Sequence, residues 1–395
     1  MRRRIFVLLI LIPLLPWLIM ANHFFYGRFN EYSDLTVSHL PNAIYLLGGL
    51  NEYHRIPFWS DLIFGGYPFA ANPLAGLWYP PGWVAYVFPQ PLGFNLVVFL
   101  HLLWGTLGMK RLLESFRLNR FASMFGAVGF LIMPKLFAHL FAGHITLIYA
   151  VCWTPWLILN QNVNRRNSRW LLNGAILGLI ALADVRWLAY ASLLWIGYCL
   201  YQYFQKERKL SIKITAVEIF AVLSLAILLS AVLLIPLVQY VELSTRGSMG
   251  QGDAAVNSLP IEEIFGLWIP DFGGFAEWVL YPGAVFFCLA VYSLVIPEIR
   301  KTTVFWWIVF SISLVLSFGD SLPIYGAVSS LPGMDLLRVP TRFYFLAGQA
   351  LLIIAAHGLD DLMQRKDVFR PDPVFFMTPF LAFSGFFGLG FYLLL

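Results

Sequence analysis

Asp34 is the central candidate for chemistry in this chain, and it lies within the stretch from Asn30 to Pro41, after the first long apolar run. A carboxylate kept where an outer loop meets the bilayer is costly to desolvate, which indicates a chemical role. It can accept the proton of an incoming hydroxyl group, as a transferase requires to make its acceptor nucleophilic. The structural alternative is an acid in the first turn of a helix, stabilised by the helix dipole.

Two further acids of the same outer segment are candidates for the same site. Glu31 precedes Asp34 by three residues, and Asp61 follows in a Trp-Ser-Asp sequence. Carboxylates that face one cleft could hold a divalent ion or divide the roles of acid and base. We favour a solvated first-turn acid for Glu31, and for Asp61 a loop-ordering role in which its carboxylate accepts backbone N–H groups. We predict no cofactor, and the sequence leaves a divalent metal open without indicating one.

Cationic groups mark the outer ends of the middle apolar runs, and they are Lys135, His139, His144 and Arg186. Near one membrane surface, such groups would form an anion site suited to a phosphate or pyrophosphate. Asp184 precedes Arg186 by two residues, so a mutual ion pair is the alternative for both. For His144 the alternative is a cap at the start of a helix.

The last outer segment supplies two guanidinium groups. Arg338 and Arg342 stand four residues apart, before the apolar run that starts at Phe343. A guanidinium group binds phosphate bidentately, and a helix N-terminus adds partial positive charge. Basic residues on the outer face run against the usual charge bias of membrane proteins. We therefore predict that at least one of the two binds phosphate.

Transmembrane helices are the elements that must position these residues. The chain has 395 residues, of which 59% are hydrophobic and 12% charged, and this composition predicts an all-α polytopic membrane protein. Eleven apolar runs are expected spans, centred near Leu14, Leu103, Val128, Trp153, Leu177, Leu194, Leu228, Ala290, Ser313, Leu352 and Phe386. Pro134 and Asp184 mark two of these runs as helices that could stop within the membrane.

Charge predicts how the spans are oriented. Most of the 26 Lys and Arg residues fall at the N-terminus or in short segments between spans, and the positive-inside rule places these in the cytoplasm. The long segments 25–90, 241–279 and 320–342 are then extracytoplasmic. We expect one domain over residues 1–395, in the cytoplasmic membrane, with its site outside.

The first outer segment also predicts a surface helix. Val37, Leu40, Ile44 and Leu47 repeat at helical spacing behind a cap at Asn30 or Ser33. This pattern is typical of an amphipathic helix that lies along the membrane surface.

Several functions are excluded by the motifs that are missing. The sequence has no Walker loop, no GxSxG and no HExxH, so we expect no nucleotide-dependent chemistry and no nucleic-acid partner. The three cysteines, Cys152, Cys199 and Cys288, each stand alone inside an apolar run, and we expect all three to be buried thiols.

Five segments, taken in order, carry a family resemblance. They are the D-x6-P arrangement from Asp34 to Pro41, the run from Ile56 to Pro73, Gly143-His144 with Trp153 to Trp156 after it, the segment around Pro236, and Leu331 to Arg342. Together they resemble the YfhO-like bacterial membrane proteins, within the GT-C superfamily of polyprenyl-phosphate-dependent glycosyltransferases. Members of this family often continue with further spans, so the resemblance implies a short member or a fragment.

The resemblance implies a GT-C-like bundle of about eleven transmembrane helices, with amphipathic surface helices in the first outer loop. It implies Asp34 as the base, with Arg338, Arg342 and His144 as ligands of the donor phosphate. The expected reaction moves a sugar, with inversion, from a polyprenyl-phosphate donor to a glycan, lipid or protein acceptor of the cell envelope. The alternatives are a transporter or flippase of lipid-linked sugars and a noncatalytic subunit of a membrane complex.

Overall fold

The computed structural model describes residues 33–63, 65–163, 168–205, 211–244, 255–270, 275–330 and 337–365. Within these ranges the regular elements are helices, apart from one isolated bridge between Ser60 and Tyr67. The expected spans near Leu14 and Phe386 lie outside the described residues, as does Glu31.

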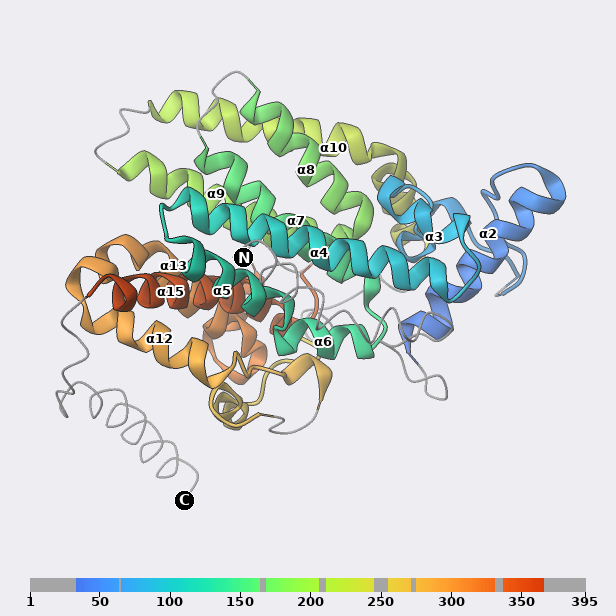
Figure 1. Cartoon of the computed structure of the whole chain (residues 1–395). Helices are drawn as coiled ribbons and strands as arrows, with labels where there is room; N and C mark the ends of the chain where they lie inside the picture. The colour runs from blue at the N-terminus through green and yellow to red at the C-terminus, as the bar shows by residue number, and fades with distance from the viewer. Residues whose placement is uncertain are drawn as a thin grey trace.

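The longer helices form the body of the molecule (Figure 1). They are α4 Leu92–Ser115, α5 Arg120–Leu131, α6 Pro134–Phe141, α7 Ile145–Asn162, α8 Arg169–Ala183, α9 Val185–Phe204, α10 Ile212–Glu242, α12 Ala284–Val295, α13 Pro297–Ser317 and α15 Tyr344–Gln364. Three other helices are α2 Leu40–Tyr53, α3 Val84–Val87 and α14 Ile324–Ser329. A π-helical turn, η1 Leu35–His39, leads into α2. The remaining turns are the 3-10 helices η2 Phe69–Ala71, η3 Pro73–Ala75, η4 Pro80–Trp83, η6 Ile261–Leu267, η7 Ala276–Trp278, η8 Gly319–Ser321 and η9 Pro340–Phe343.

Five helical stretches are long and apolar enough to cross a membrane. They are Leu92–Ser115, Arg120–Phe141, Ile212–Glu242, Pro297–Ser317 and Pro340–Gln364. All nine expected spans whose centres are described coincide with a helix. These features are those of a helical membrane protein.

Both expected helix breaks are present. The helix around Val128 stops at Leu131, and α6 starts again at Pro134, because a proline cannot supply the N–H that an uninterrupted helix needs. Asp184 separates α8 from α9, and its side chain accepts the N–H of Arg186 as an N-cap. The second break places the carboxylate of Asp184 between two apolar helices.

The core centres on α15, which is buried along nearly its whole length and packs against α5, α12 and α13. A helix that is apolar on all sides is expected in such a central position. Figure 1 shows α8, α9 and α10 on one side of α4 and α7, with α12, α13 and α15 on the other. The outermost of these, α10, packs on α8 and leaves most of its apolar surface exposed.

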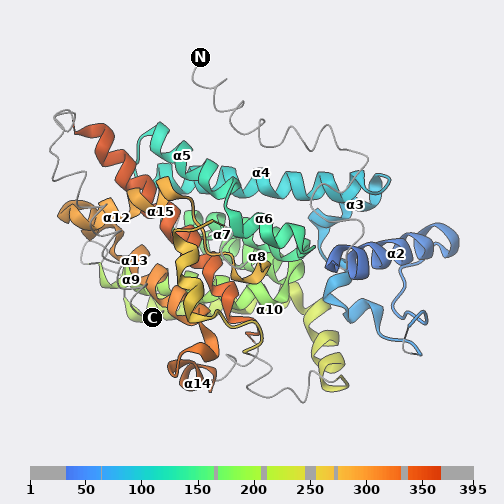
Figure 2. The ribbon, with the colours of Figure 1, turned by 90° about the horizontal axis from the view of Figure 1, so that it is seen from below.

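The expected surface helix is present as η1 and α2, which project beside the bundle (Figure 2). Val37 and Ile44 of the predicted apolar face are exposed, as expected of side chains that would face lipid, whereas Leu35, Ala43 and Leu46 are buried against the protein. The wider π-helical turn changes the angular spacing of the side chains before α2 begins. Leu46 then packs into a small cluster with aromatic residues of the following loop.

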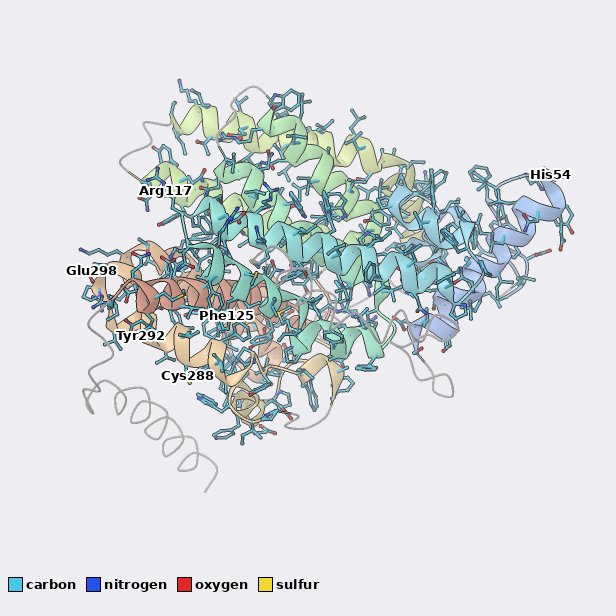
Figure 3. All side chains as sticks on the ribbon, in the orientation of Figure 1. His54, Arg117, Phe125, Cys288, Tyr292 and Glu298 are labelled. Carbon is cyan, nitrogen blue, oxygen red and sulfur yellow. The ribbon has the colours of Figure 1, made fainter. Side chains whose placement is uncertain are left out.

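The cysteine prediction holds for Cys152 and Cys199, which are buried, and is wrong for Cys288. Cys288 is exposed on α12 (Figure 3). The physical reason is that α12 packs only one side against α13 and α15. An apolar stretch in a membrane protein can face lipid as well as protein, so composition alone does not predict burial there.

Several segments that were expected to be cytoplasmic lie at one end of the bundle. At one end, Asn162 Nδ2 donates to Ser115 Oγ (2.9 Å), and Asn119 N–H donates to Asp360 Oδ1 (2.7 Å). Arg117 and Glu298 lie towards this end, and His54 lies at the opposite extreme of the molecule (Figure 3). The expected cytoplasmic segments that are described therefore come together at one end.

Candidate functional site

Asp34 is held at the start of η1 by the loop between α6 and α7. Its N–H donates to the carbonyl of Ala142 (3.1 Å). Gly143 has φ +83°, and a Cβ added there would stand 2.4 Å from the backbone nitrogen of Leu35. Only glycine permits both this conformation and this approach. The next residue, His144, then brings its Nε2 to 3.4 Å from Asp34 Oδ2.

Glu277, in η7, is the acid at the centre of the site, and the sequence analysis did not identify it. Its Oε2 lies 2.8 Å from His139 Nε2, and its Oε1 accepts from Arg342 Nη2 (3.0 Å). Its backbone carbonyl accepts from Lys135 Nζ, and its Oε1 lies 3.9 Å from His144 Nδ1. One buried carboxylate thus joins α6, the loop before α7 and the start of α15.

Charge keeps Glu277 ionised although it is 4% exposed. Burial alone would raise its pKa, but His139, Arg342 and Lys135 outweigh burial and hold the pKa well below its usual range. At Asp34 the balance is reversed: burial raises the pKa of its carboxyl group, and Arg186 and Arg342 lower it only in part. The two acids of the site are therefore in different electrostatic environments.

His144 lies between these two acids. Burial lowers the pKa of its imidazole, and the neighbouring His139 and Arg342 lower it further. A neutral imidazole carries a proton on one nitrogen and a lone pair on the other. His144 can therefore donate towards one acid while it presents a lone pair on the opposite side.

Asp184 and Arg186 form the ion pair that the sequence left as an alternative. Arg186 Nε donates to Asp184 Oδ1 (2.9 Å), and Arg186 Nη2 donates to Oδ2 (2.5 Å). Thr146 Oγ1 also donates to Oδ2 (3.3 Å). Asp184 is buried, whereas 30% of the Arg186 side chain is exposed. Arg186 acts electrostatically on Asp34, so the pair lies beside the site.

Arg338 and Arg342 occupy different positions. Arg342 lies in η9, next to the N-terminus of α15, and is buried. Arg338 precedes Val339, whose φ of +67° is rare for a β-branched residue and interrupts any helical register between the two arginines. Arg338 is half-buried, and its Nε has no hydrogen-bond partner in the part of the chain that the structure describes. The spacing of four residues therefore does not place the pair on one helical face.

The structure brings together most of the residues predicted for the site. Asp34, Lys135, His139, His144 and Arg342 all surround Glu277 or one of its partners. Lys135 is fully buried between the Glu277 carbonyl and the ring of Phe345. It is therefore bound within the protein, where an external phosphate would have to displace an existing contact.

Asp61 does not join this group. It is exposed, next to the Ser60–Tyr67 bridge in the loop that follows α2. The N–H of Leu62 donates to Ser60 Oγ (3.5 Å), which supplies the side-chain contact to the backbone that Asp61 was expected to make. Glu31 lies outside the described residues.

Glu277 was missed because its sequence neighbourhood contains several acids, among them Glu262 and Glu263. One signal could have separated it from these. Glu277 stands alone between aromatic residues in Phe-Ala-Glu-Trp, and an isolated acid among large apolar side chains is costly to bury unless cations reach it. Which cations reach it depends on residues more than 60 positions away.

The arrangement combines a proton acceptor with a buried set of positive charges. Asp34, with 43% of its side chain exposed, lies at the accessible edge, while Arg342 and Lys135 lie in the buried part. No protein-family model matches the chain, and no curated protein sequence matches it. The function must therefore be argued from these residues.

Proposed function

We propose that the chain is a GT-C-type membrane glycosyltransferase of the YfhO-like kind, which uses a polyprenyl-phosphate sugar as donor. The observation that carries the proposal is the contact of Asp34 with His144 at the accessible edge of a buried cluster that contains Arg342. A proton acceptor from the start of the chain and a guanidinium from near its end thus lie close together. An acid and cations in one site are what such a transfer requires.

In the proposed reaction, Asp34 accepts the proton of an acceptor hydroxyl group. The acceptor oxygen forms a bond to the anomeric carbon of the donor sugar from the side opposite the phosphate. The bond between that carbon and the phosphate oxygen breaks, and polyprenyl phosphate leaves with the electron pair. The sugar is transferred with inversion, and the proton remains on Asp34 until it passes to solvent or phosphate.

The departing phosphate needs cations that it can reach. Arg338 is half-buried, and no described residue accepts a hydrogen bond from its Nε. Arg186 is paired with Asp184, but 30% of its side chain is exposed. These two are the direct ligands in the proposal. Arg342 and Lys135 are already bound to Glu277 and act through their field, which is strong in a site that excludes water.

An apolar groove supports a lipid-linked donor. It runs between α9 and α13, lined by Leu193, Gly197, Phe305, Ile312, Leu316 and Phe343 among others. Phe343 directly follows Arg342 in the chain, so we propose that this end of the groove faces the cations. A hydrocarbon chain in the groove would place its phosphate at their level.

We also propose the topology expected from the charge pattern. In this topology the protein crosses the cytoplasmic membrane about eleven times, with its N-terminus in the cytoplasm and its site on the extracytoplasmic side. The acceptor is a glycan, lipid or protein of the cell envelope. The gathering of the described basic segments at the end of the bundle remote from His54 supports this orientation.

The transport alternative requires charged groups within the spans that remain available to a substrate. Glu218 of α10 is instead paired with Arg169 of α8, where Arg169 Nε donates to Oε1 (2.5 Å). His101 of α4 lies 2.6 Å from the hydroxyl of Tyr79. These contacts give the alternative no support.

The test is donor turnover by the purified protein in detergent, with labelled polyprenyl-phosphate hexose and envelope membranes as the source of acceptor. Asp34→Asn should lower turnover by about 100- to 10,000-fold, because a positioned proton acceptor supplies a factor of this size. Binding of the donor should be retained, because the amide keeps the shape of the side chain.

Asp61→Asn is the matched control, because Asp61 is an exposed acid in the same outer segment and lies outside the cluster. Its turnover should equal that of the wild type. Near-normal turnover in Asp34→Asn, or no turnover in the wild type, would rule out the proposed mechanism.

A further inference from the structure

His139, His144 and Glu277 form a set of three ligating side chains at the centre of the cluster. One ligand atom from each lies within 4.8 Å of the ligand atoms of the other two. His139 and Glu277 are buried, and His144 is mostly buried. Two imidazole nitrogens and a carboxylate oxygen are a common ligand set for catalytic zinc and for related divalent transition ions.

The second nitrogen of each imidazole is oriented by an acceptor outside the set. His139 Nδ1 lies 3.0 Å from the backbone carbonyl of Lys135. His144 Nε2 lies 3.4 Å from the carboxylate of Asp34. Metal-binding histidines usually donate their outer N–H to such a carbonyl or carboxylate, which fixes the tautomer and directs the lone pair inward.

With the outer nitrogens protonated, the inner ones point lone pairs at Glu277. His139 Nε2 is 2.8 Å from Glu277 Oε2, and both atoms are then acceptors. His144 Nδ1 is buried, has no hydrogen-bond partner among the described residues, and lies 3.9 Å from Glu277 Oε1. Two acceptor atoms this close repel each other unless a cation lies between them. That cation is either a proton or a metal ion.

We propose that His139 Nε2, His144 Nδ1 and a carboxylate oxygen of Glu277 bind one divalent transition-metal ion, with Zn²⁺ the preferred species. Bonds of about 2.0–2.2 Å in tetrahedral geometry would set neighbouring ligand atoms about 3.3–3.6 Å apart. His139 Nε2 and Glu277 Oε2, now 2.8 Å apart, would separate, and His144 Nδ1, now 3.9 Å from Glu277 Oε1, would move closer. The fourth position is left for water or an anionic ligand.

The neighbouring charges indicate what that fourth ligand is. Asp34 and Glu277 balance Lys135 and Arg342, so a bound divalent ion leaves a net positive charge at the site. An oxyanion such as phosphate compensates that charge best. This metal site goes beyond the proposed transfer reaction, and its test does not depend on turnover.

The experiment is a metal titration of tag-free full-length protein in detergent, after removal of metal with a chelator and gel filtration. Co²⁺ serves as the spectroscopic probe, and Zn²⁺ as its competitor. We expect one equivalent of Co²⁺ per chain, with the visible absorption of a nitrogen- and oxygen-ligated ion. Zn²⁺ should displace the Co²⁺ and abolish this absorption.

Variants connect the binding to these side chains. His144→Asn, which removes a ligand, should lower the affinity by at least about 100-fold, and Asp34→Asn, which removes only the orienting acceptor, by about 10- to 100-fold. His101→Asn is the control, because His101 is a buried histidine whose partners are Tyr79 and Val97.

Failure of the wild-type protein to retain one equivalent of either metal would show that a proton occupies the place between His139 and Glu277. Unchanged affinity in a folded His144→Asn variant would assign the metal to another site. Either result overturns the proposal, even if one of the variants does not fold.

Discussion

Glu277 connects three cationic or potentially cationic groups that come from two distant parts of the chain. Lys135 and His139 lie on α6, and Arg342 lies before α15. Desolvation of an acid costs several kcal/mol, and only well-placed partners offset this cost. Removal of the acid would leave these groups buried without their counter-charge. The single residue therefore contributes to stability and to the site at once.

We expect Glu277→Ala to lower the free energy of unfolding by about 3–5 kcal/mol, the usual loss when one partner of a buried ion pair is removed. The measurement is unfolding in mixed detergent micelles. Glu262→Ala is the control, because Glu262 is exposed in η6, and its change should stay within about 0.5 kcal/mol. Equal stability of the two variants would mean that the cluster does not hold the helices together.

Short connections between elements position the site. The loop Ala142–His144 brings α6 and α7 against η1, and it does so through backbone atoms. Ser33 and Thr36 secure the start of η1, since the N–H of each lies within hydrogen-bond distance of the other's hydroxyl oxygen (3.2 and 3.4 Å). Asp34 is thus fixed from both sides. The precision of its contact with His144 depends on these turns more than on the long helices.

A methyl group at position 143 should disturb this connection. Gly143→Ala places a Cβ against the backbone of Leu35 in a left-handed conformation, so we expect a loss of stability larger than about 1 kcal/mol. Donor turnover should fall as Asp34 is displaced. Both are measured on the purified protein, by unfolding in mixed micelles and by the donor assay.

Gly48→Ala provides the matched control for Gly143→Ala. Gly48 lies within α2, and a Cβ there meets no atom within 4 Å. This change should stabilise the protein by about 0.5–1 kcal/mol, as alanine does in a helix, and should leave turnover unchanged. If both glycine variants behave alike, the close approach at Gly143 is not what holds Asp34.

At the scale of the whole molecule, the two ends of the helix bundle carry different sets of polar side chains. One end holds polar side chains that join α4 to α7 and α5 to α15. The cluster around Glu277 lies where α7, α9 and α15 begin. Such a separation suits a protein whose two ends face different compartments.

Cysteine labelling in cells tests this orientation. His54 and Glu298 are exposed and lie at opposite extremes of the molecule (Figure 3). In a Cys288→Ser background, His54→Cys should react with a membrane-impermeant maleimide in intact cells, whereas Glu298→Cys should react only in inverted vesicles. Cys152 and Cys199 are buried and should remain silent. Labelling of both positions from the same side would contradict the proposed topology.

The sequence by itself determined the helical nature of the chain and the place of most helices. Long apolar runs must satisfy their backbone hydrogen bonds internally in a membrane, and a helix does so within the run itself. The breaks at Pro134 and Asp184 were also predicted from the sequence, and the pair of Asp184 with Arg186 was one of its two alternatives. All of these depend on residues that are close in sequence.

Only the tertiary structure decided which acid is central and which face of α2 is buried. Glu277 meets His139 and Arg342 across separations of 138 and 65 residues, and Leu46 packs on a loop whose path no local pattern specifies. Likewise, Asp61 and Asp34 belong to one outer segment, yet only Asp34 reaches the cluster. Contacts of this kind follow from how whole helices pack, which the periodicity of a single segment does not contain.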